Sequence, residues 1–288
     1  MTIFLYRYIY NAAILILLIV LLTACSSTSL IYVFVEKFIQ DEIAFFLDLD
    51  KEESVLLDQQ VSEMVTWHRT SMLPSYAVYF NNIADKLEGD QYGANDITKI
   101  LKNGRSLIKE TVNGLTPFAS KFLIRHQKIE AIEFIEKKMA IRRQERLEKI
   151  SIPEVQLYEE RLESLKLNFG RFFGDLFDEQ VMLLEVHARM TIGDQGIRLK
   201  NRTLRQKAFI SFLETQPTEV ELTSYLNKLL LRGYIITNPD YKAFSETSLK
   251  RFKLLLVKML AISSTKQRKK IISKLRDYAG DFESVAKN

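Results

Sequence analysis

The sequence predicts an all-α protein with about ten helices in a single large helical domain, preceded by a secretion leader. Turn residues are scarce, with 10 Gly and 5 Pro in 288 residues, whereas all-β designs need turns often. Most prolines stand beside capping residues, where helices are expected to begin. Between these sites apolar residues recur every three or four positions, and no sustained alternation of period two appears. Apolar residues make up 47% of the chain, which is enough to build a core.

Residues 12–22 form an unbroken apolar run that is typical of a signal peptide. As a helix this run would be about 16 Å long, roughly half of the hydrocarbon core of a bilayer. Arg7 interrupts the apolar residues that precede it. The stretch is therefore interpreted as a leader and not as a permanent transmembrane helix.

The residues Leu22-Thr23-Ala24-Cys25 resemble the lipobox of bacterial lipoproteins. The resemblance implies cleavage between Ala24 and Cys25 and lipid attachment at Cys25, with N-terminal acyl chains that hold the protein on a membrane. By the same resemblance, Ser26 in the next position implies sorting to the outer membrane of a Gram-negative bacterium, with a body that faces the periplasm. Cys25 is the only cysteine, which excludes a disulfide scaffold and a cysteine-rich metal site.

The predicted organisation is a signal peptide over 1–24, an acylated Cys with a short tether over 25–29, and a helical domain over 30–288. Two lobes that meet near 150–153 are an alternative within that domain. Four tether residues reach at most about 14 Å, which keeps the body close to the membrane. The first helix, from Leu30 to Leu47, is apolar over a wide face. We expect it in the core, with interfacial membrane contact as the alternative.

Helix starts are predicted from prolines and capping residues along the mature chain. All five prolines are expected at helix starts, with Pro117 and Pro239 in the first helical position. An apolar stripe from Phe118 to Ile150 predicts one continuous helix of about 32 residues, or about 48 Å. Gly233 is expected to end a helix, and only 234–237 looks strand-like. The spacing of a capping box, with an N-cap acceptor followed three residues later by Glu or Gln, occurs at 50–53, 151–154, 218–221 and 264–267.

Charge is distributed unevenly along the chain. Residues 26–60 carry six more acids than bases, and residues 250–276 carry 10 cations and no acid. The two segments could face each other, or be ordinary solvated surfaces. Alternatively, the second segment forms a basic surface for anionic lipid or acidic polypeptides, with Arg268, Lys269 and Lys270 as candidate binding residues. Nucleic acid is not expected as a partner in the periplasm.

Residues suited to catalysis are few, and we assign no catalytic residue, cofactor or metal site. Each of the three histidines, His68, His126 and His187, shares a helical stripe with apolar residues, which favours a core position. His126 and Glu130 stand four apart, as two metal ligands on one helix can. A metal- or carboxylate-dependent hydrolase of envelope polymers remains an alternative, although no HExxH, phosphate loop or G-x-S-x-G is present.

Trp67, His68 and Arg69 form the most distinctive local cluster, because Trp67 is the only tryptophan. An aromatic ring beside an arginine could bind a peptide or a glycan. Packing at the end of a helix that Leu73-Pro74 closes is the favoured interpretation.

Several motifs together resemble an uncharacterised family of helical lipoproteins from Gram-negative bacteria. The resemblance implies a location and a helical fold, and it implies no activity. The residues that carry it are Cys25, Tyr32, Phe38, Phe46-Leu-Asp-Leu-Asp50, Trp67-His-Arg69, Leu73-Pro-Ser-Tyr76, Gly174-Asp-Leu-Phe-Asp-Glu-Gln180 and Arg276-Asp-Tyr278.

Three segments resemble the Leu-Thr-x-x-Gln element of the Spy and CpxP type of periplasmic chaperones, which bind unfolded clients. The segments differ from that element in every copy, and the same spacing also occurs in capping boxes. We expect a binding function, with chaperone-like capture of unfolded or assembling envelope proteins as its concrete form. A structural or assembly factor with one dedicated partner is the alternative. The three segments are 49–53, 176–180 and 263–267.

Overall fold

The protein is all-α over the residues that the computed structural model describes, which are 27–287. No strand occurs in that range. Helices α3 and α4 are continuous through a π-helical turn, so the described residues form ten helical rods, which confirms the predicted fold class. The elements are α2 (Ser27–Phe46), α3 (Lys51–Trp67), η1 (His68–Met72), α4 (Leu73–Glu88), α5 (Ala94–Leu123), α6 (Ile129–Ile150), α7 (Glu154–Phe173), α8 (Asp178–Thr191), α9 (Asp194–Leu213), α10 (Glu219–Arg232), η2 (Gly233–Ile235), α11 (Tyr241–Ala261) and α12 (Thr265–Lys287).

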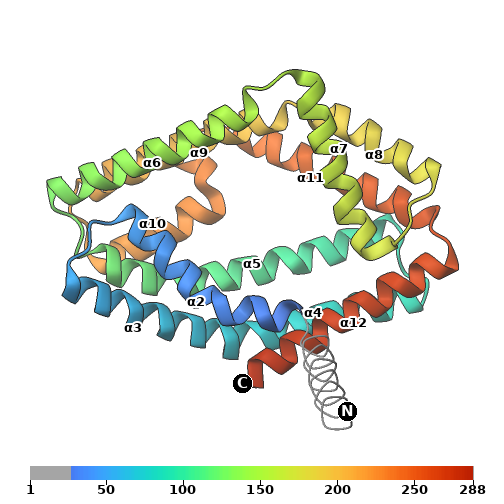
Figure 1. Cartoon of the computed structure of the whole chain (residues 1–288), viewed down its shortest axis with the longest axis horizontal. Helices are drawn as coiled ribbons and strands as arrows, with labels where there is room; N and C mark the ends of the chain where they lie inside the picture. The colour runs from blue at the N-terminus through green and yellow to red at the C-terminus, as the bar shows by residue number, and fades with distance from the viewer. Residues whose placement is uncertain (1–26, 288) are drawn as a thin grey trace, which may run out of the picture.

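The helices form an elongated, flattened ring (Figure 1). One long edge is made by α3, η1 and α4, and α12 packs along α4. The opposite edge is made by α6 and α9, which lie side by side, and α7 crosses from that edge to α12. Helix α5 runs between the two edges and packs against α10 and α11.

Two hydrophobic clusters, one toward each end of the ring, form the core. The first joins α2, α3, α5, α6, α9 and α10 around the fully buried Leu213 and Leu222. The second joins α4, α5, α7, α8, α11 and α12 around the fully buried Leu184 and Met259. Each cluster takes residues from both sides of 150–153. Helix α5, which is about 45 Å long, contributes to both clusters and so ties the two ends together.

Three of the four predicted capping boxes are confirmed, and the fourth is wrong. Helix α7 begins directly after Pro153, without a side-chain cap. The reason is that the Ser151 hydroxyl donates to the Leu147 carbonyl at 2.7 Å and so belongs to the end of α6. The confirmed pairs are Asp50 with Glu53, Thr218 with Glu221 and Ser264 with Gln267.

Pro117 does not begin a helix, contrary to the prediction, but lies inside α5. A proline inside a helix leaves the carbonyl four residues earlier without its usual N–H donor. Here that carbonyl belongs to Asn113, and the buried Thr116 hydroxyl lies 3.3 Å from it. The same hydroxyl lies 3.0 Å from Asn227 Oδ1 of α10. The break in the hydrogen-bond ladder is therefore covered by a neighbouring side chain, and the helix continues.

The predicted helix over 118–150 is also wrong, because α5 ends at Leu123 and α6 begins at Ile129. The buried His126 ring causes part of this break, since its Nδ1 lies 3.1 Å from the Phe122 carbonyl at the end of α5. His126 and Glu130 therefore do not share a helix. The turn lets α6 leave α5 and run along the opposite edge of the ring (Figure 1).

Helix α2 is partly in the core, as expected, and partly exposed. Its Ile43 and Phe46 pack against the first cluster, whereas Phe34 and Phe38 are 67% and 64% exposed. It begins at Ser27, so part of the expected tether is helical. None of the helices within 27–287 is long and apolar enough to cross a membrane. Residues 234–237 form no strand, because η2 continues the chain from Gly233 as a 3₁₀ turn.

Candidate functional site

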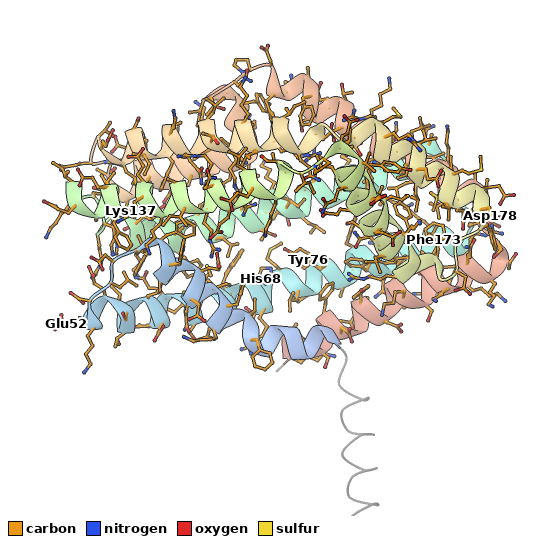
Figure 2. All side chains as sticks on the ribbon, turned by 45° about the horizontal axis from the view of Figure 1, so that its top comes forward. Glu52, His68, Tyr76, Lys137, Phe173 and Asp178 are labelled. Carbon is orange, nitrogen blue, oxygen red and sulfur yellow. The ribbon has the colours of Figure 1, made fainter. Side chains whose placement is uncertain are left out.

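The Trp67–His68–Arg69 cluster lies where α3 passes into the π-helical turn. The Trp67 ring packs on Gly114 of α5, where a Cβ atom would lie 1.9 Å from the ring. His68 Nε2 lies 3.4 Å from the Tyr76 hydroxyl, and burial lowers the pKa of His68. Figure 2 shows His68 and Tyr76 close together near the middle of the molecule. The fold therefore packs this cluster against α5 and connects it, through Tyr76, with the central pocket described below.

The basic segment 250–276 lies on α11 and α12, and several of its cations have partners within the chain. Arg251 Nη2 lies 2.7 Å from an Asp194 carboxylate oxygen. Arg276 pairs with two carboxylates of α4, and Arg268 donates to the Ser263 carbonyl at 2.6 Å. Lys269 and Lys270 are exposed. Within 27–287, no ion pair joins this segment to the acidic residues before position 61.

The remaining predicted site residues are not brought together. Ala24 and Cys25 lie outside the described residues. The histidines stand on three different elements, η1, α8 and the turn after α5, and no group of three His, Cys, Asp or Glu side chains within 27–287 could hold a metal ion. His187 lies beside Arg161 and Arg251, and burial, followed by these two cations, lowers its pKa.

Two of the three chaperone-like segments meet in the fold. The buried Gln180 and Gln267 side chains exchange hydrogen bonds of 3.1 and 2.8 Å. Each glutamine also accepts a backbone N–H at the start of its own helix. The segment at 49–53 lies at the opposite end of the ring, as Glu52 and Asp178 show in Figure 2. The pair therefore joins the starts of α8 and α12, which is a structural role.

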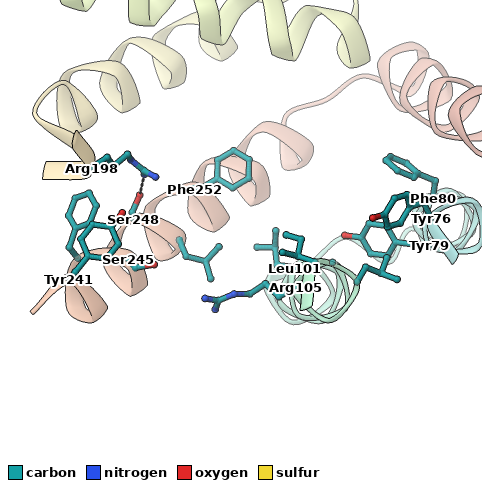
Figure 3. A pocket seen from close by; sticks show the side chains of 15 residues that line it. Tyr76, Tyr79, Phe80, Leu101, Arg105, Arg198, Tyr241, Ser245, Ser248 and Phe252 are labelled. Atoms are coloured by element: carbon teal, nitrogen blue, oxygen red, sulfur yellow. Dashed lines mark hydrogen bonds between the residues drawn. The ribbon is translucent and has the colours of Figure 1, made fainter. Parts of the chain in front are cut away.

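A central pocket of about 670 Å³ lies between α4 and α5 on one side and α9 and α11 on the other (Figure 3). Its size falls within the usual range for ligand pockets. Most of its lining is aromatic or aliphatic, with Arg105 and Arg198 as its cations. Arg198 donates to the Ser248 hydroxyl at 2.8 Å, which is the dashed line in Figure 3. Burial raises the pKa of Tyr79, whose hydroxyl donates to the Ile100 carbonyl.

A second hollow, the basic pocket, adjoins the central pocket and has a volume of about 460 Å³. It lies among the end of α6, the α9 helix and the first residue of α11. Arg198 and Tyr241 line both hollows. No carboxylate lines the basic pocket. Its cations are Arg146, Lys149, Arg198, Arg202 and Arg205.

Sequence reasoning missed the basic pocket, although part of it has a sequence pattern. Arg198, Arg202 and Arg205 are spaced by four and three residues, which places them on one helical face. Arg146 and Lys149 come from a different helix, about 50 residues earlier. Only the packing of α6 on α9 brings the two groups together.

An exposed apolar face lies on α8 and α11. We call Met182, Val186, Met190 and Leu254 the α8–α11 face; these side chains are 61%, 56%, 56% and 53% exposed. The three α8 residues are one turn apart, and Val186, Met190 and Leu254 line a shallow hollow together with Lys258. Methionine side chains adapt to different apolar partners, so this composition suits a binding surface.

The comparison with protein families identifies this chain at the level of a family. The model of a family of unknown function, DUF6279, matches residues 45–242. The chain belongs to this family, which agrees with the resemblance to an uncharacterised family. No curated protein and no solved structure matches the chain.

Proposed function

We propose that this member of a family of unknown function is a lipid-anchored binding protein on the periplasmic face of the outer membrane of a Gram-negative bacterium. It captures unfolded or assembling envelope polypeptides. The lipobox-like residues 22–25 support the anchor and the location. The exposed α8–α11 face carries the capture function.

The first described helix supports a body that lies close to the membrane. Helix α2 begins at Ser27, only two residues after Cys25. Phe34 and Phe38 follow one turn apart on α2 and are exposed. Exposed aromatic side chains near an acyl anchor are suited to the membrane interface. Their position agrees with the interfacial contact considered for this helix.

The α8–α11 face supports capture of polypeptides because it is apolar, adaptable and bordered by positive charge. Its methionines can pack against varied side chains. Lys258 stands at the edge of the hollow that Met190 and Leu254 line. A cation there favours clients with acidic residues beside apolar ones. Contiguous exposed apolar side chains are uncommon on proteins without such partners.

Aggregation suppression tests this function. The protein used begins at residue 25 and carries Cys25→Ser, so that no acyl chain is attached. We expect it to slow the aggregation of a chemically unfolded outer-membrane protein, and Met182→Ser/Met190→Ser to remove most of that protection. The matched control is Val155→Ser/Val220→Ser, which removes two apolar side chains that are 69% and 79% exposed elsewhere. Absence of protection at several-fold molar excess would rule out the capture function.

A dedicated partner is the second candidate function, and the two pockets favour it. The Arg198 side chain, which both pockets share, is held in place by its hydrogen bond to Ser248, and preformed sites suit one ligand or partner. Photocrosslinking in cells from position 268 separates the two functions. A broad set of outer-membrane proteins supports capture, whereas one dominant crosslinked band supports a dedicated structural role.

A further inference from the structure

We propose that the basic pocket and the central pocket together bind an amphiphile that carries two neighbouring phosphoryl groups. The phosphoryl groups lie among the cations of α6 and α9, and the apolar body lies in the central pocket. This site is separate from the α8–α11 face, so it stands whether or not polypeptide capture does.

The charge of the basic pocket calls for more than one phosphoryl group. Arg198 has a carboxylate partner, Asp194, at 3.8 Å. The other four cations are Arg146, Lys149, Arg202 and Arg205, and none of them forms an ion pair with a carboxylate of residues 27–287. Two phosphoryl groups carry about three to four negative charges near neutral pH, which matches these four cations.

Arg202 stands near two of the other cations, Arg146 and Arg205, which repel it. Its partial burial, and then these two cations, lower the pKa of its guanidinium. No acid on the pocket wall offsets this repulsion. An anion placed among the three guanidinium groups would relieve it, and arginine is well suited to phosphate because its N–H donors match the phosphate oxygens.

Arg205 supplies a second, independent observation. Its Nε is buried and has no hydrogen-bond partner among the described residues. Buried N–H groups in proteins almost always have an acceptor. The stem of Arg205 lies against Gly233 of η2, where a Cβ atom would come within 2.6 Å of Arg205 Cδ. The chain thus makes room for this arginine at the pocket and leaves its buried Nε–H without an acceptor within 27–287.

The adjoining central pocket indicates an apolar body on the ligand. Arg198 and Tyr241 line both hollows, so the two hollows adjoin at these side chains, where the two parts of the proposed ligand would meet. Figure 3 shows Arg198 and Tyr241 at one side of the central pocket, with Phe252 and Leu101 along its wall. Ile108 also lines the pocket and is 60% exposed. Apolar side chains that remain in water at a preformed pocket favour an apolar ligand group.

The first experiment probes the phosphoryl site with inorganic pyrophosphate. The full chain, purified in a nonionic detergent, is titrated calorimetrically with pyrophosphate and with orthophosphate at equal ionic strength. We expect saturable binding, with pyrophosphate at least about tenfold tighter than orthophosphate. Equal affinities for the two anions would overturn the proposal, as would an absence of saturable pyrophosphate binding.

Variants show whether the pocket is responsible. Arg202→Gln/Arg205→Gln should weaken pyrophosphate binding at least about tenfold. Lys266→Gln/Lys269→Gln removes the same charge from the start of α12 and should change it less than about twofold, because salt screens distant charges. Gly233→Ala displaces Arg205 without changing the charge and should also weaken binding. Equal losses in the two charge variants would overturn the proposal.

Far-ultraviolet circular dichroism checks that each variant folds. If Arg202→Gln/Arg205→Gln unfolds, Arg146→Gln/Arg202→Gln replaces it, because both of those positions are exposed.

A second titration identifies the source of the phosphoryl groups. Farnesyl diphosphate carries the same head on an apolar chain, and we expect it to bind at least about tenfold more tightly than pyrophosphate. Ile108→Ser/Phe252→Ser should remove that advantage and leave pyrophosphate binding unchanged; the single Ile108→Ser variant serves if the pair unfolds. Equal affinity for the two probes would assign the site to a soluble diphosphate and overturn the amphiphile.

Discussion

Two regions of this protein are strongly basic, and they differ in what their charges contact. The segment 250–276 carries 10 cations without an acid in its sequence. In the fold, its Arg251 and Arg276 pair with carboxylates of other helices, and Arg268 donates to a backbone carbonyl. The basic pocket draws five cations from two helices far apart in sequence, and four of them form no ion pair within 27–287.

The difference shows that charge density along a chain is a weak guide to an anion site. Successive residues of a helix point in different directions, so a basic stretch on α12 spreads its cations around the helix. Residues spaced by three and four share a face, as Arg198, Arg202 and Arg205 do on α9. An anion site forms where such a face meets a second one, here at the end of α6.

The largest expected effect concerns the basic segment and is on stability. Asp194→Ala removes the partner of Arg251, and both side chains are mostly buried, at 12% and 21% exposure. Because the uncompensated cation stays in place, we expect the free energy of unfolding to fall by about 2–4 kcal/mol. Asp85→Ala, at an exposed partner of Arg276, should cost at most about 1 kcal/mol. Urea unfolding measures both, and equal losses would contradict the distinction.

The next effect concerns the pocket and is on binding. Arg202→Glu places a negative charge among Arg146 and Arg205 and should weaken pyrophosphate binding by roughly 2–3 kcal/mol. Lys269→Glu makes the same charge change in the basic segment and should have little effect. Calorimetry compares the two. A larger loss for Lys269→Glu would mean that the basic segment is the anion site.

The start of α12, within the basic segment, is held by hydrogen bonds between two uncharged side chains, Gln180 and Gln267. Gln180→Leu leaves the buried Gln267 amide at the start of α12 without one of its partners. We expect a loss of about 1–3 kcal/mol in the free energy of unfolding. Glu179→Ala, at an exposed neighbouring position, is the control. A Gln180→Leu protein as stable as wild type would show that this pair does not hold α8 to α12.

A smaller effect is expected when the pH changes. Burial lowers the pKa of His68 and His187, and Arg161 and Arg251 lower that of His187 further. The unfolded chain therefore binds protons more readily, so stability is full above an unfolded pKa of about 6.5 and declines below it. Urea unfolding between pH 8 and 5 should show this decline, and His68→Gln/His187→Gln should reduce it. An unchanged slope in the double variant would assign the decline to other groups.

The smallest effect is a gain in stability. Arg202→Met keeps an unbranched side chain and removes one of the pocket's repelling charges. Arg202 is exposed and screened by solvent, so we expect the unliganded protein to gain only a few tenths of a kcal/mol. Thermal unfolding at low ionic strength measures it. A loss of stability would mean that the arginine makes a favourable contact in the free protein.

The fold was predictable from sequence where the deciding interactions are local. Capping at Asp50, Thr218 and Ser264 involves residues three apart, and the helical class follows from apolar spacing. The errors arose where another part of the chain decides the conformation. Pro117 is tolerated inside α5 because Thr116 covers the open carbonyl and contacts α10.

The candidate sites were less predictable for the same reason. The arginine spacing on α9 is visible in the sequence, but its meeting with Arg146 depends on the packing of α6. The α8–α11 face has ordinary helical spacing, and its exposure follows only from which helices cover α8. Conversely, the Trp67 cluster looked distinctive in sequence, and the fold packs its indole ring against Gly114.

The most direct test of this account is an NMR titration that resolves the arginine side-chain Nε–Hε resonances. Pyrophosphate is added to the protein that begins at residue 25 and carries Cys25→Ser. The account predicts selective shifts for Arg146, Arg202 and Arg205, with Arg268 and Arg276 unchanged. Shifts confined to Arg268 and Arg276, or equal shifts at every arginine, would contradict it.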